Sequence, residues 1–423
     1  MNLLWKLINY FVFLFPLYMS FVWIAGGLLF YFRWERKKYP DPDPDSLPLF
    51  SIIVPAHNEE EHIKPTITNL ENLNYPQYEV IVVNDGSQDK TSQILDELAQ
   101  HYQKWLKVIH LSPNSGKAQA TNVGIVLSKG HFVLIMDADC FLDKDALTWI
   151  SLHFLSHPRV GAVTGNPRVV NRTTLLGKIQ VGEYSSIIGL IKRTQRILGK
   201  ILTVSGVIAA FRKSAFYDCG LFDNDTVTED IDMTWKLQKK FWDIRYEPQA
   251  LCWVLVPETI RGLWRQRIRW AQGGVEVLKK HANVWLNGKQ RRLWPIYTEY
   301  VISILWAHSF VFLVVAWLIM YLFYYFDTSF FAVSSLIFPV VPGWTGSILA
   351  LVCLLQVIVS LCIDTRYESK SSLKYYFWAV WYPFFYWFLS ALAIIVAVCN
   401  VFVRKSGVSA TWESPDRGLH TLK

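Results

Sequence analysis

Long apolar stretches lie near both ends of the chain, and a middle part of ordinary globular character separates them. Residues 9–32 form an apolar run long enough to span a bilayer. The basic flank at residues 33–38 predicts that this end faces the cytoplasm. Further apolar runs occupy residues 302–325, 347–363 and 377–403. We therefore expect a transmembrane helix and linker over residues 1–47, and a second transmembrane region with a tail over residues 296–423.

The charges of the linkers bear on the side of the membrane that each linker occupies. Residues 327–346 carry almost no charge, as expected outside, whereas residues 364–375 contain three basic residues, as expected inside. Four single crossings would leave the C-terminus outside, but the tail has four basic residues (Arg404, Lys405, Arg417 and Lys423) and argues for inside. Pro383 could split the last run into an interfacial piece and a span, or a re-entrant turn. The sequence therefore leaves open whether the number of membrane crossings is even or odd, and on which side the C-terminus lies.

Strand-like and helix-like patterns alternate in the middle of the chain. Residues 50–54, 80–83 and 132–136 are short apolar runs typical of buried parallel strands, and residues 91–102 form an amphipathic helical pattern. This alternation predicts an α/β domain with a Rossmann-like, mostly parallel sheet over residues 48–255. The next segment, residues 256–295, is rich in Trp and Arg and predicts amphipathic helices at the membrane surface.

Composition narrows the class of protein. The chain is 52% hydrophobic with a formal net charge of +8, and its basic residues are not interleaved with aromatics as in a nucleic-acid reader. We expect no nucleic-acid partner, because basic residues attracted to an anionic bilayer explain the excess more simply. The six cysteines form no CxxC pair and no zinc-site spacing, so we expect no disulfide framework and a soluble part in a reducing compartment.

Polar residues follow each of the three predicted strands. The candidates for donor binding and for a metal are Pro55, Asn58 and Glu59 after the first strand, Asp85 after the second, and Asp137 and Asp139 after the third. The carboxyl ends of parallel strands line one crevice in open α/β sheets, so these clusters should converge. Asp137 and Asp139 are hard oxygen ligands that suit Mg²⁺ or Mn²⁺ beside a substrate diphosphate. Alone, the pair would be an ordinary polar turn.

Three residues of this crevice have competing interpretations. Asp85 could accept an N–H of a pyrimidine base, or form a turn with Gly86, or both. Lys117 follows a glycine and precedes a predicted helix, so it is either a nucleotide contact or a solvated surface lysine. His57 has no partners for a catalytic triad, and we interpret it as structural.

Two later motifs offer acceptor chemistry. Asp230 in Thr228-Glu229-Asp230 could be a general base that removes the proton of an acceptor hydroxyl, or a helix-capping acid. Gln266, Arg269 and Trp270 share one helix face, because positions i, i+3 and i+4 line up. An amide, a fixed cation and an aromatic plate suit a diphosphate and a sugar ring. The alternative is a membrane-surface helix.

Three further residues are candidates for acceptor contact. Glu229 lies beside the proposed base, and Ser205 and Gly206 precede an apolar stretch at residues 207–211. Gly206 could let the backbone approach the acceptor closely, or it could be a packing bend. Trp270 would stack beneath the acceptor sugar.

The order of these motifs resembles that of the membrane-bound, processive glycosyltransferases of family 2. The stretches at residues 163–168, 181–190, 205–211 and 414–418 are similar to the branch of bacterial poly-β-1,6-N-acetylglucosamine synthases. The resemblance implies a GT-A-like domain, UDP-N-acetylglucosamine as donor, Mg²⁺ and a growing β-linked biofilm polysaccharide. Asp85 would hold the uridine, Asp139 the metal with help from Asp137, and Asp230 would be the base. Gln266, Arg269 and Trp270 would gate the diphosphate and the acceptor.

The resemblance also implies a location and a partner. It places the chain in the bacterial inner (plasma) membrane with a cytoplasmic catalytic domain, beside a small membrane subunit, with cyclic di-GMP acting on the pair. The chain has one N-terminal span where some relatives have two. The alternatives are a chitin- or hyaluronan-type synthase, an inactive membrane scaffold or nucleotide sensor, and a transporter. The last has poor support, because the spans contain few ionisable residues and no repeated halves.

Overall fold

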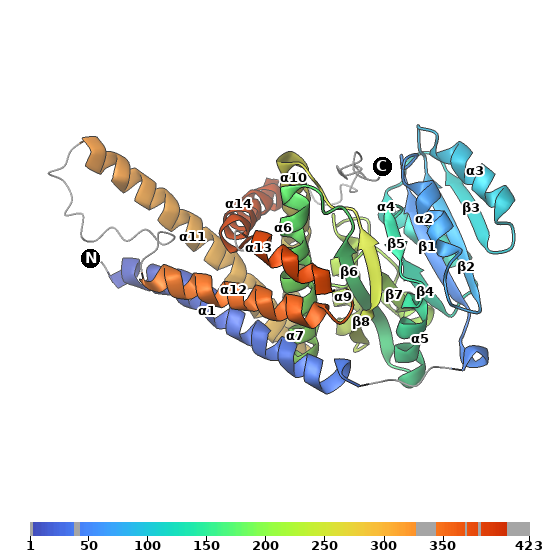
Figure 1. Cartoon of the computed structure of the whole chain (residues 1–423), viewed down its shortest axis with the longest axis horizontal. Coiled ribbons are helices and arrows are strands. Elements are labelled where there is room, and N and C mark those ends of the chain that lie inside the picture. The colour runs from blue at the N-terminus through green and yellow to red at the C-terminus, as the bar shows by residue number, and fades with distance from the viewer. Residues whose placement is uncertain (1–2, 38–42, 327–343, 369, 380–381, 404–423) are drawn as a thin grey trace.

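The computed structural model describes residues 3–37, 43–326, 344–368, 370–379 and 382–403. A helical part and an α/β layer follow one another along the long axis (Figure 1). The helical part contains α1 (Leu3–Phe30) with the π-helical turn η1 (Tyr31–Glu35), α11 (Trp294–Phe326), α12 (Trp344–Asp364) and α14 (Tyr382–Val403). These are the four described helices that are long and apolar enough to cross a membrane. The predicted apolar runs therefore form helices with the length and composition of membrane spans.

The last predicted run is divided between two helices. The short helix α13 (Tyr376–Ala379) precedes α14, and Pro383 is the second residue of α14. Proline is tolerated in a first helical turn, because the N–H that it lacks has no intrahelical partner there. The window of α14 that could cross a membrane begins at Phe385. Residues 327–343 and the basic tail 404–423 lie outside the described residues, so the parity prediction stays open.

One eight-stranded sheet forms the centre of the α/β layer, in the order β3-β2-β1-β4-β7-β6-β8-β5. Its first half, β3 (Leu106–Leu111), β2 (Tyr78–Asp85), β1 (Phe50–Ala56) and β4 (Phe132–Ile135), is entirely parallel. In the second half, β7 (Ala209–Arg212) is antiparallel to β4 and to β6 (Val160–Val169). The strand β8 (Asp243–Val254) is parallel to β6, and β5 (Cys140–Leu142) is antiparallel to β8. The predicted strands at residues 50–54 and 80–83 are confirmed within β1 and β2, and the third is confirmed as β4 except for its last residue, Met136.

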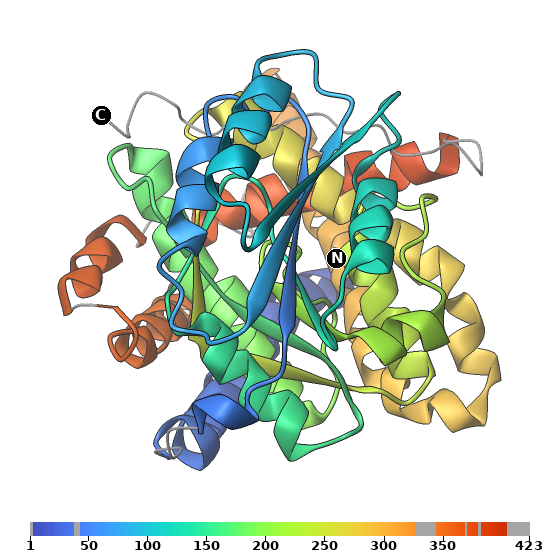
Figure 2. The ribbon, with the colours of Figure 1, turned by 90° about the vertical axis from the view of Figure 1, so that its right-hand side faces the viewer.

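Helices cover both faces of the sheet (Figure 2). One face packs on α2 (Ile63–Leu70), α3 (Thr91–His101) and α5 (Ala146–Ser156), and the other on α4 (Lys117–Leu127), α8 (Lys213–Cys219) and α9 (Glu229–Lys239). Successive side chains of β1 enter the two cores in turn, with Ile52 in the first and Ile53 in the second. A strand buried on both faces needs apolar residues at every position, which explains the unbroken runs in the sequence.

A third group of helices lies between the sheet and the membrane helices (Figure 1). It consists of α6 (Leu175–Glu183), the π-helical turn η3 (Tyr184–Leu190), α7 (Ile191–Leu198) and α10 (Ile260–Lys280). The helix α10 lies within residues 256–295, the segment for which amphipathic helices are predicted. Short 3₁₀ turns complete the described chain: η2 (Pro44–Ser46), η4 (Ala282–Leu286), η5 (Gly288–Leu293) and η7 (Lys370–Tyr375).

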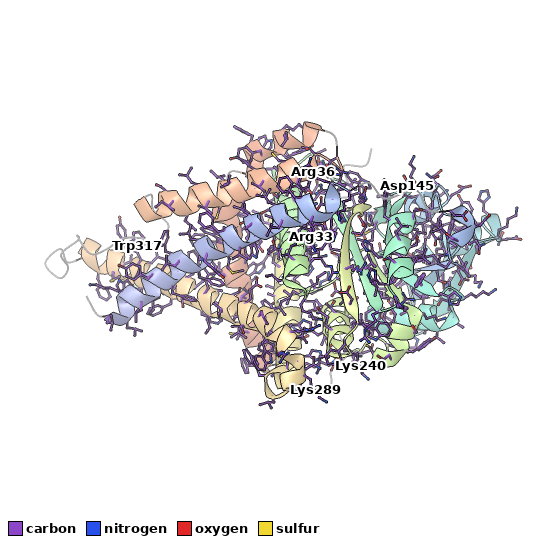
Figure 3. The ribbon with its side chains drawn as sticks, turned by 90° about the horizontal axis from the view of Figure 1, so that it is seen from below. Arg33, Arg36, Asp145, Lys240, Lys289 and Trp317 are labelled. Carbon is purple, nitrogen blue, oxygen red and sulfur yellow. The ribbon has the colours of Figure 1, made fainter. Side chains whose placement is uncertain are left out.

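A buried ion network attaches two membrane helices to the α/β layer. Arg193 of α7 donates to Glu35 at the end of α1 (2.6 Å) and to Asp364 at the end of α12 (3.2 Å). Arg168 of β6 also reaches Asp364 (2.6 Å). Buried charges are tolerated only when they are paired, so this network ties the ends of α1 and α12 to the sheet. In Figure 3, the labelled Arg33 and Arg36 lie at this same end of α1.

Candidate active site

A polar cavity of about 720 Å³ lies at the carboxyl ends of β1 and β2. His57, Asn58, Ser87 and Asn114 contribute to its lining. Asn58 has a φ of 54°, a left-handed conformation that asparagine tolerates. Its N–H donates to Ser87 Oγ (2.9 Å), and its Oδ1 accepts from the N–H of Gln88 (2.8 Å). The loops after the first two predicted strands therefore meet.

His57 joins these loops. Its Nδ1 donates to the carbonyl oxygen of Asp85 at 2.8 Å, because a carbonyl can only accept. This position agrees with a structural interpretation of His57.

Asp85 is fully buried and holds the loop that precedes α4. Its carboxylate accepts from Ser115 N (2.8 Å), Ser115 Oγ (2.7 Å) and Gly116 N (2.7 Å). The carboxylate of Asp85 accepts three hydrogen bonds from the protein and has no exposed surface. In this conformation it therefore does not reach the pyrimidine base of a nucleotide. The expected turn also differs, since the partners of Asp85 lie on the loop at residues 115–116. Any effect of Asp85 on uridine binding remains a prediction, and it would act through that loop.

Two predicted donor ligands lie beneath the crevice. Pro55 is a buried residue within β1. The carboxylate of Glu59 has no exposed surface and lies 3.7 Å from His62 Nδ1. Neither side chain has surface open to the crevice in this conformation. Their contact with the donor stays a prediction.

Lys117 connects the third strand end with the start of α9. Its Nζ lies 2.6 Å from Asp137 Oδ1 and 3.4 Å from Glu229 Oε1. Burial lowers the pKa of Lys117, but the charges of Asp137 and Glu229 outweigh burial and raise the pKa above its ordinary value. Lys117 is therefore a cation within the site, and the interpretation as a solvated surface lysine is wrong. Glu229, predicted to contact the acceptor, faces this lysine.

Asp137 and Asp139 differ in accessibility. The side chain of Asp137 is 29% exposed, whereas Asp139 is buried with the Cys140 thiol 3.4 Å from its Oδ1. Two carboxylates at a strand end supply the hard oxygen atoms that Mg²⁺ and Mn²⁺ prefer. The residues present fit a divalent cation, with Asp137 open to solvent and Asp139 behind it.

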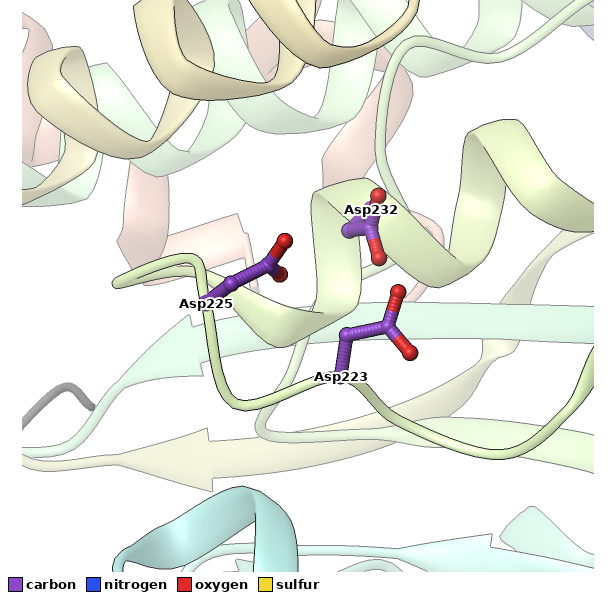
Figure 4. Close-up of side chains that lie close together, drawn as sticks. All are labelled: Asp223, Asp225 and Asp232. Carbon is purple, nitrogen blue, oxygen red and sulfur yellow. The ribbon is translucent and has the colours of Figure 1, made fainter. Parts of the chain in front are cut away.

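A second acidic group serves a different purpose (Figure 4). Ligand atoms of Asp223, Asp225 and Asp232 lie within 4.8 Å of one another. The ammonium of Lys280 touches all three, at 2.7, 2.8 and 3.0 Å. A protein cation already balances these charges, so the group braces the end of α10 against α9.

Asp230 lies at the start of α9 and is in contact with the loop at residues 205–206. Its Oδ2 accepts from Gly206 N (3.1 Å), and its Oδ1 accepts from Ile231 N (2.9 Å). Burial and the charge of Glu229 raise the pKa of Asp230 to about 6, against the opposing effects of Lys117 and the two N–H groups. The N-cap residue of α9 is Thr228, so Asp230 is not the helix cap. A carboxylate with this pKa is a competent base at neutral pH.

The segment Ser205-Gly206 approaches Asp230 closely. A Cβ added at Gly206 would lie 3.1 Å from Asp230 Oδ2, so a larger residue would crowd this hydrogen bond. Ser205 Oγ accepts from Lys192 Nζ, and Ser205 N donates to Thr164 Oγ1 (2.9 Å). The close approach foreseen for Gly206 is thus an approach to the predicted base.

Helix α10 presents its predicted residues around an arginine that the motif does not name. Arg267 is 5% exposed and donates to Glu183 Oε2 of α6 at 2.6 Å. Its guanidinium lies 4.4 Å from the Trp270 ring, and its Nη1 donates to Gln266 Oε1 (3.1 Å). Arg269 is exposed, and its charge opposes the protonation of Lys117. Arg267 therefore fixes Gln266 and Trp270, while Arg269 is exposed and lies within electrostatic range of Lys117.

Consecutive glycines bring α10 against its neighbours. A Cβ at Gly273 would overlap the Thr228 side chain, and one at Gly274 would overlap the Tyr300 hydroxyl. Their absence lets α10 pack directly on the start of α9. The two acceptor-side motifs, distant in sequence, meet for this reason.

The sequence did not reveal Lys192, Arg267 and Glu183 as site residues. Glu183 carried a signal, because it is an acidic residue within the largely apolar stretch at residues 179–190. Burial of a charge is visible only after folding, so the two basic residues carried no such signal.

The geometry agrees with comparisons to known proteins. A family model described as "Glycosyltransferase like family 2" matches residues 48–273, more than half of the chain. The chain belongs to glycosyltransferase family 2. Poly-beta-1,6-N-acetyl-D-glucosamine synthase of Staphylococcus epidermidis is 40% identical over 96% of this chain and 98% of its own length. The protein of the same name from Staphylococcus aureus strain COL is also 40% identical, with the same coverage.

A solved glycosyltransferase shares the architecture. The mannosyltransferase PcManGT from Pyrobaculum calidifontis, in complex with GDP-Man and Mn²⁺, superposes with a TM-score of 0.60 over 93% of this chain and 100% of its own. Sequence identity is 20%, so this likeness supports the fold alone. The prediction of a GT-A-like glycosyltransferase with transmembrane helices is confirmed. Membership of this enzyme family argues against the transporter and scaffold alternatives.

Proposed function

We propose that this glycosyltransferase polymerises N-acetylglucosamine from UDP-N-acetylglucosamine into a β-1,6-linked biofilm polysaccharide, with inversion at the anomeric carbon. The names of the two staphylococcal relatives support this product. The observation that carries the chemistry is the half-buried Asp230, whose carboxylate accepts from Gly206 N and whose pKa is raised to about 6 by desolvation and the charge of Glu229. A base of this kind would remove the acceptor hydroxyl proton as that oxygen attacks the sugar.

The donor half would bind the nucleotide sugar at the carboxyl ends of β1, β2 and β4. The cavity beside Asn58 and Ser87 would take the nucleoside, with Asp85 holding its wall. Asp137 and Asp139 would hold Mg²⁺ or Mn²⁺, which when bound neutralises the charge of the diphosphate. Lys117 would exchange its contact with Asp137 for one with the diphosphate, and so stay paired with an anion.

The acceptor half would bind the growing polymer between α9 and α10. Trp270 would stack under the terminal sugar, with its ring fixed by Arg267. Gln266 and Arg269 would close over the leaving diphosphate. Ser205, Gly206 and Glu229 would shape the wall beside Asp230 rather than bind sugar alone.

The membrane arrangement follows from the same geometry. The basic end of α1, with Arg33 and Arg36, lies next to the α/β layer (Figure 3), so this layer would face the cytoplasm of a bacterium. The polymer would form beside the membrane helices, and the same chain would assist its export. A small membrane subunit and cyclic di-GMP acting on the pair complete the proposal.

Membrane vesicles test this function directly. Vesicles that contain this chain would receive UDP-N-acetylglucosamine with Mg²⁺ or Mn²⁺, with and without a candidate small subunit and cyclic di-GMP. We expect a polymer that a β-1,6-specific hydrolase degrades and chitinase leaves intact. A product that yields only to chitinase would favour the chitin-type alternative. A product containing uronic acid, formed only when a second nucleotide sugar is added, would favour the hyaluronan type.

A further inference from the structure

Lys192 is a buried cation on the acceptor side of the site that the motifs do not include. It belongs to α7 and is 5% exposed. Its Nζ donates to Ser205 Oγ and to Thr164 Oγ1 (3.2 Å). No carboxylate oxygen of the described residues lies within 4.0 Å of this nitrogen. A buried ammonium without a salt bridge is costly, since desolvation of a charge takes several kcal/mol.

A short backbone bridge joins this lysine to Asp230. Ser205 accepts from Lys192, and the next residue, Gly206, donates its N–H to Asp230 Oδ2 at 3.1 Å. Thr164 Oγ1 accepts from both Lys192 Nζ and Ser205 N, which fixes the serine between strand and helix. The lysine and the carboxylate therefore hold opposite ends of a two-residue segment.

The electrostatics connect the same two groups. Burial lowers the pKa of Lys192 to about 7, and the Asp230 charge is what opposes a larger drop. Two further charged groups act on Asp230: Glu229 of its own helix and Lys117 of α4. Arg269 of α10 acts on Lys117 in turn. Lys192 thus carries its positive charge mainly below pH 7, which is the range in which Asp230 titrates.

Helix α7 is firmly held behind Lys192. The next residue, Arg193, is fully buried and binds Glu35 of η1, the turn that continues α1, and Asp364 of α12. Two successive side chains of α7 therefore have different partners. Lys192 contacts the loop at residues 205–206 beside Asp230, and Arg193 contacts the ends of the apolar helices. The position of the ammonium is fixed by the fold and does not depend on a bound ligand.

We propose that Lys192 is a positioning residue for the transfer reaction, which holds Ser205 and Gly206 against Asp230 and favours the ionised form of that carboxylate. The proposal rests on the proposed function, because it takes Asp230 as the base. It assigns to Lys192 a part that a purely structural lysine would not have, namely an influence on the pH at which the base becomes active.

The test is the pH profile of kcat/KM for polymer synthesis in vesicles, measured for three variants. Lys192→Gln keeps hydrogen-bond donors and removes the charge, so the acid limb should move upward by about one pH unit. Activity at pH 6 would then fall about fivefold. Lys192→Arg keeps the charge and should keep the limb of the parent enzyme. Ser205→Ala removes the bridging hydroxyl and should lower the rate while leaving the limb in place.

The controls separate this proposal from the proposed function. Lys200→Met removes another lysine just beyond α7 and should change neither rate nor limb. If Lys192→Gln binds donor normally but retains the acid limb of the parent, the positioning proposal is wrong. Should Lys192→Gln fail to fold, a Lys192→Arg enzyme with a shifted limb, or a Ser205→Ala enzyme with full activity, would overturn it equally. Full polymer synthesis by Asp230→Asn would instead overturn Asp230 as the base.

Discussion

The donor and acceptor halves of the site are built in different ways. In the donor half, loops at the strand ends hold one another by hydrogen bonds, such as Asn58 to Ser87 and Asp85 to Gly116. In the acceptor half, charges are buried between helices, with Arg267 on Glu183 and Lys192 beside Asp230. The donor half therefore needs only the α/β layer, while the acceptor half also needs the helices that lie against the membrane.

This difference connects catalysis with the membrane. Arg193 ties α7 to the ends of α1 and α12, one residue after Lys192. Glu183, which holds Arg267, leads directly into the π-helical turn that packs on α12. A movement of the membrane helices would thus displace residues of the acceptor half more than residues of the donor half.

Replacing the general base Asp230 should reduce polymer synthesis more than any other change. It should affect the acceptor half of the site and leave donor binding intact. Asp230→Asn keeps the shape of the side chain but cannot accept a proton, so polymer synthesis should fall by roughly 10²–10⁴-fold. Donor binding should stay nearly unchanged, as measured by calorimetry with UDP in detergent. A variant that loses both together would show that the halves are not independent.

Crowding the contact between the two acceptor motifs should have the next largest effect. A methyl group at Gly273 would overlap the side chain of Thr228 and push α10 from the start of α9. Overpacking costs about 1–3 kcal/mol, so Gly273→Ala should lower synthesis about ten- to hundredfold with UDP affinity retained. Gly288→Ala is the matched control, because a Cβ there meets nothing within 4 Å. Equal activities of the two variants would contradict the packing argument.

The donor half could be predicted from sequence better than the acceptor half, for a physical reason. A strand buried on both faces is a continuous apolar run, and the polar residues at its end must lie at one edge of the sheet. This local signal located Asn58, Asp85 and Asp137. Glu59 is buried beside His62, because a polar residue after a strand can also turn inward.

The acceptor half depends on partners that are far apart in the chain. Lys192 lies in a segment that looks like the basic face of a surface helix, and only Thr164 and Ser205 make it a buried cation. Helical spacing placed Gln266, Arg269 and Trp270 together but passed over Arg267, which is held by Glu183 84 residues away. Burial of a charge is a tertiary property that periodicity does not report.

Weakening the contact that fixes the Trp270 ring should have a smaller effect, and this effect should be confined to the KM for the acceptor. Arg267→Lys keeps a positive charge for Glu183 but loses the planar guanidinium over Trp270. Cation–π contacts contribute about 0.5–1 kcal/mol, so KM for an N-acetylglucosamine oligomer should rise roughly two- to fivefold, with KM for the donor unchanged. In a Trp270→Phe background the same change should add less. An equal effect in both backgrounds would mean that Arg267 does not act through the tryptophan.

The smallest effect is the change in the rate of the unmodified enzyme between pH 7.5 and pH 6. Burial and Glu229 raise the pKa of Asp230 to about 6, so the carboxyl is ionised above this pH and protonated below it. Synthesis should therefore stand near its plateau at pH 7.5, fall to about half at pH 6, and fall to about a tenth at pH 5. UDP affinity measured at the same pH values separates loss of the base from loss of the donor. An acid limb near pH 4 would mean that the proton-accepting carboxylate is solvent-exposed, and that the acceptor half is more open than its buried charges require.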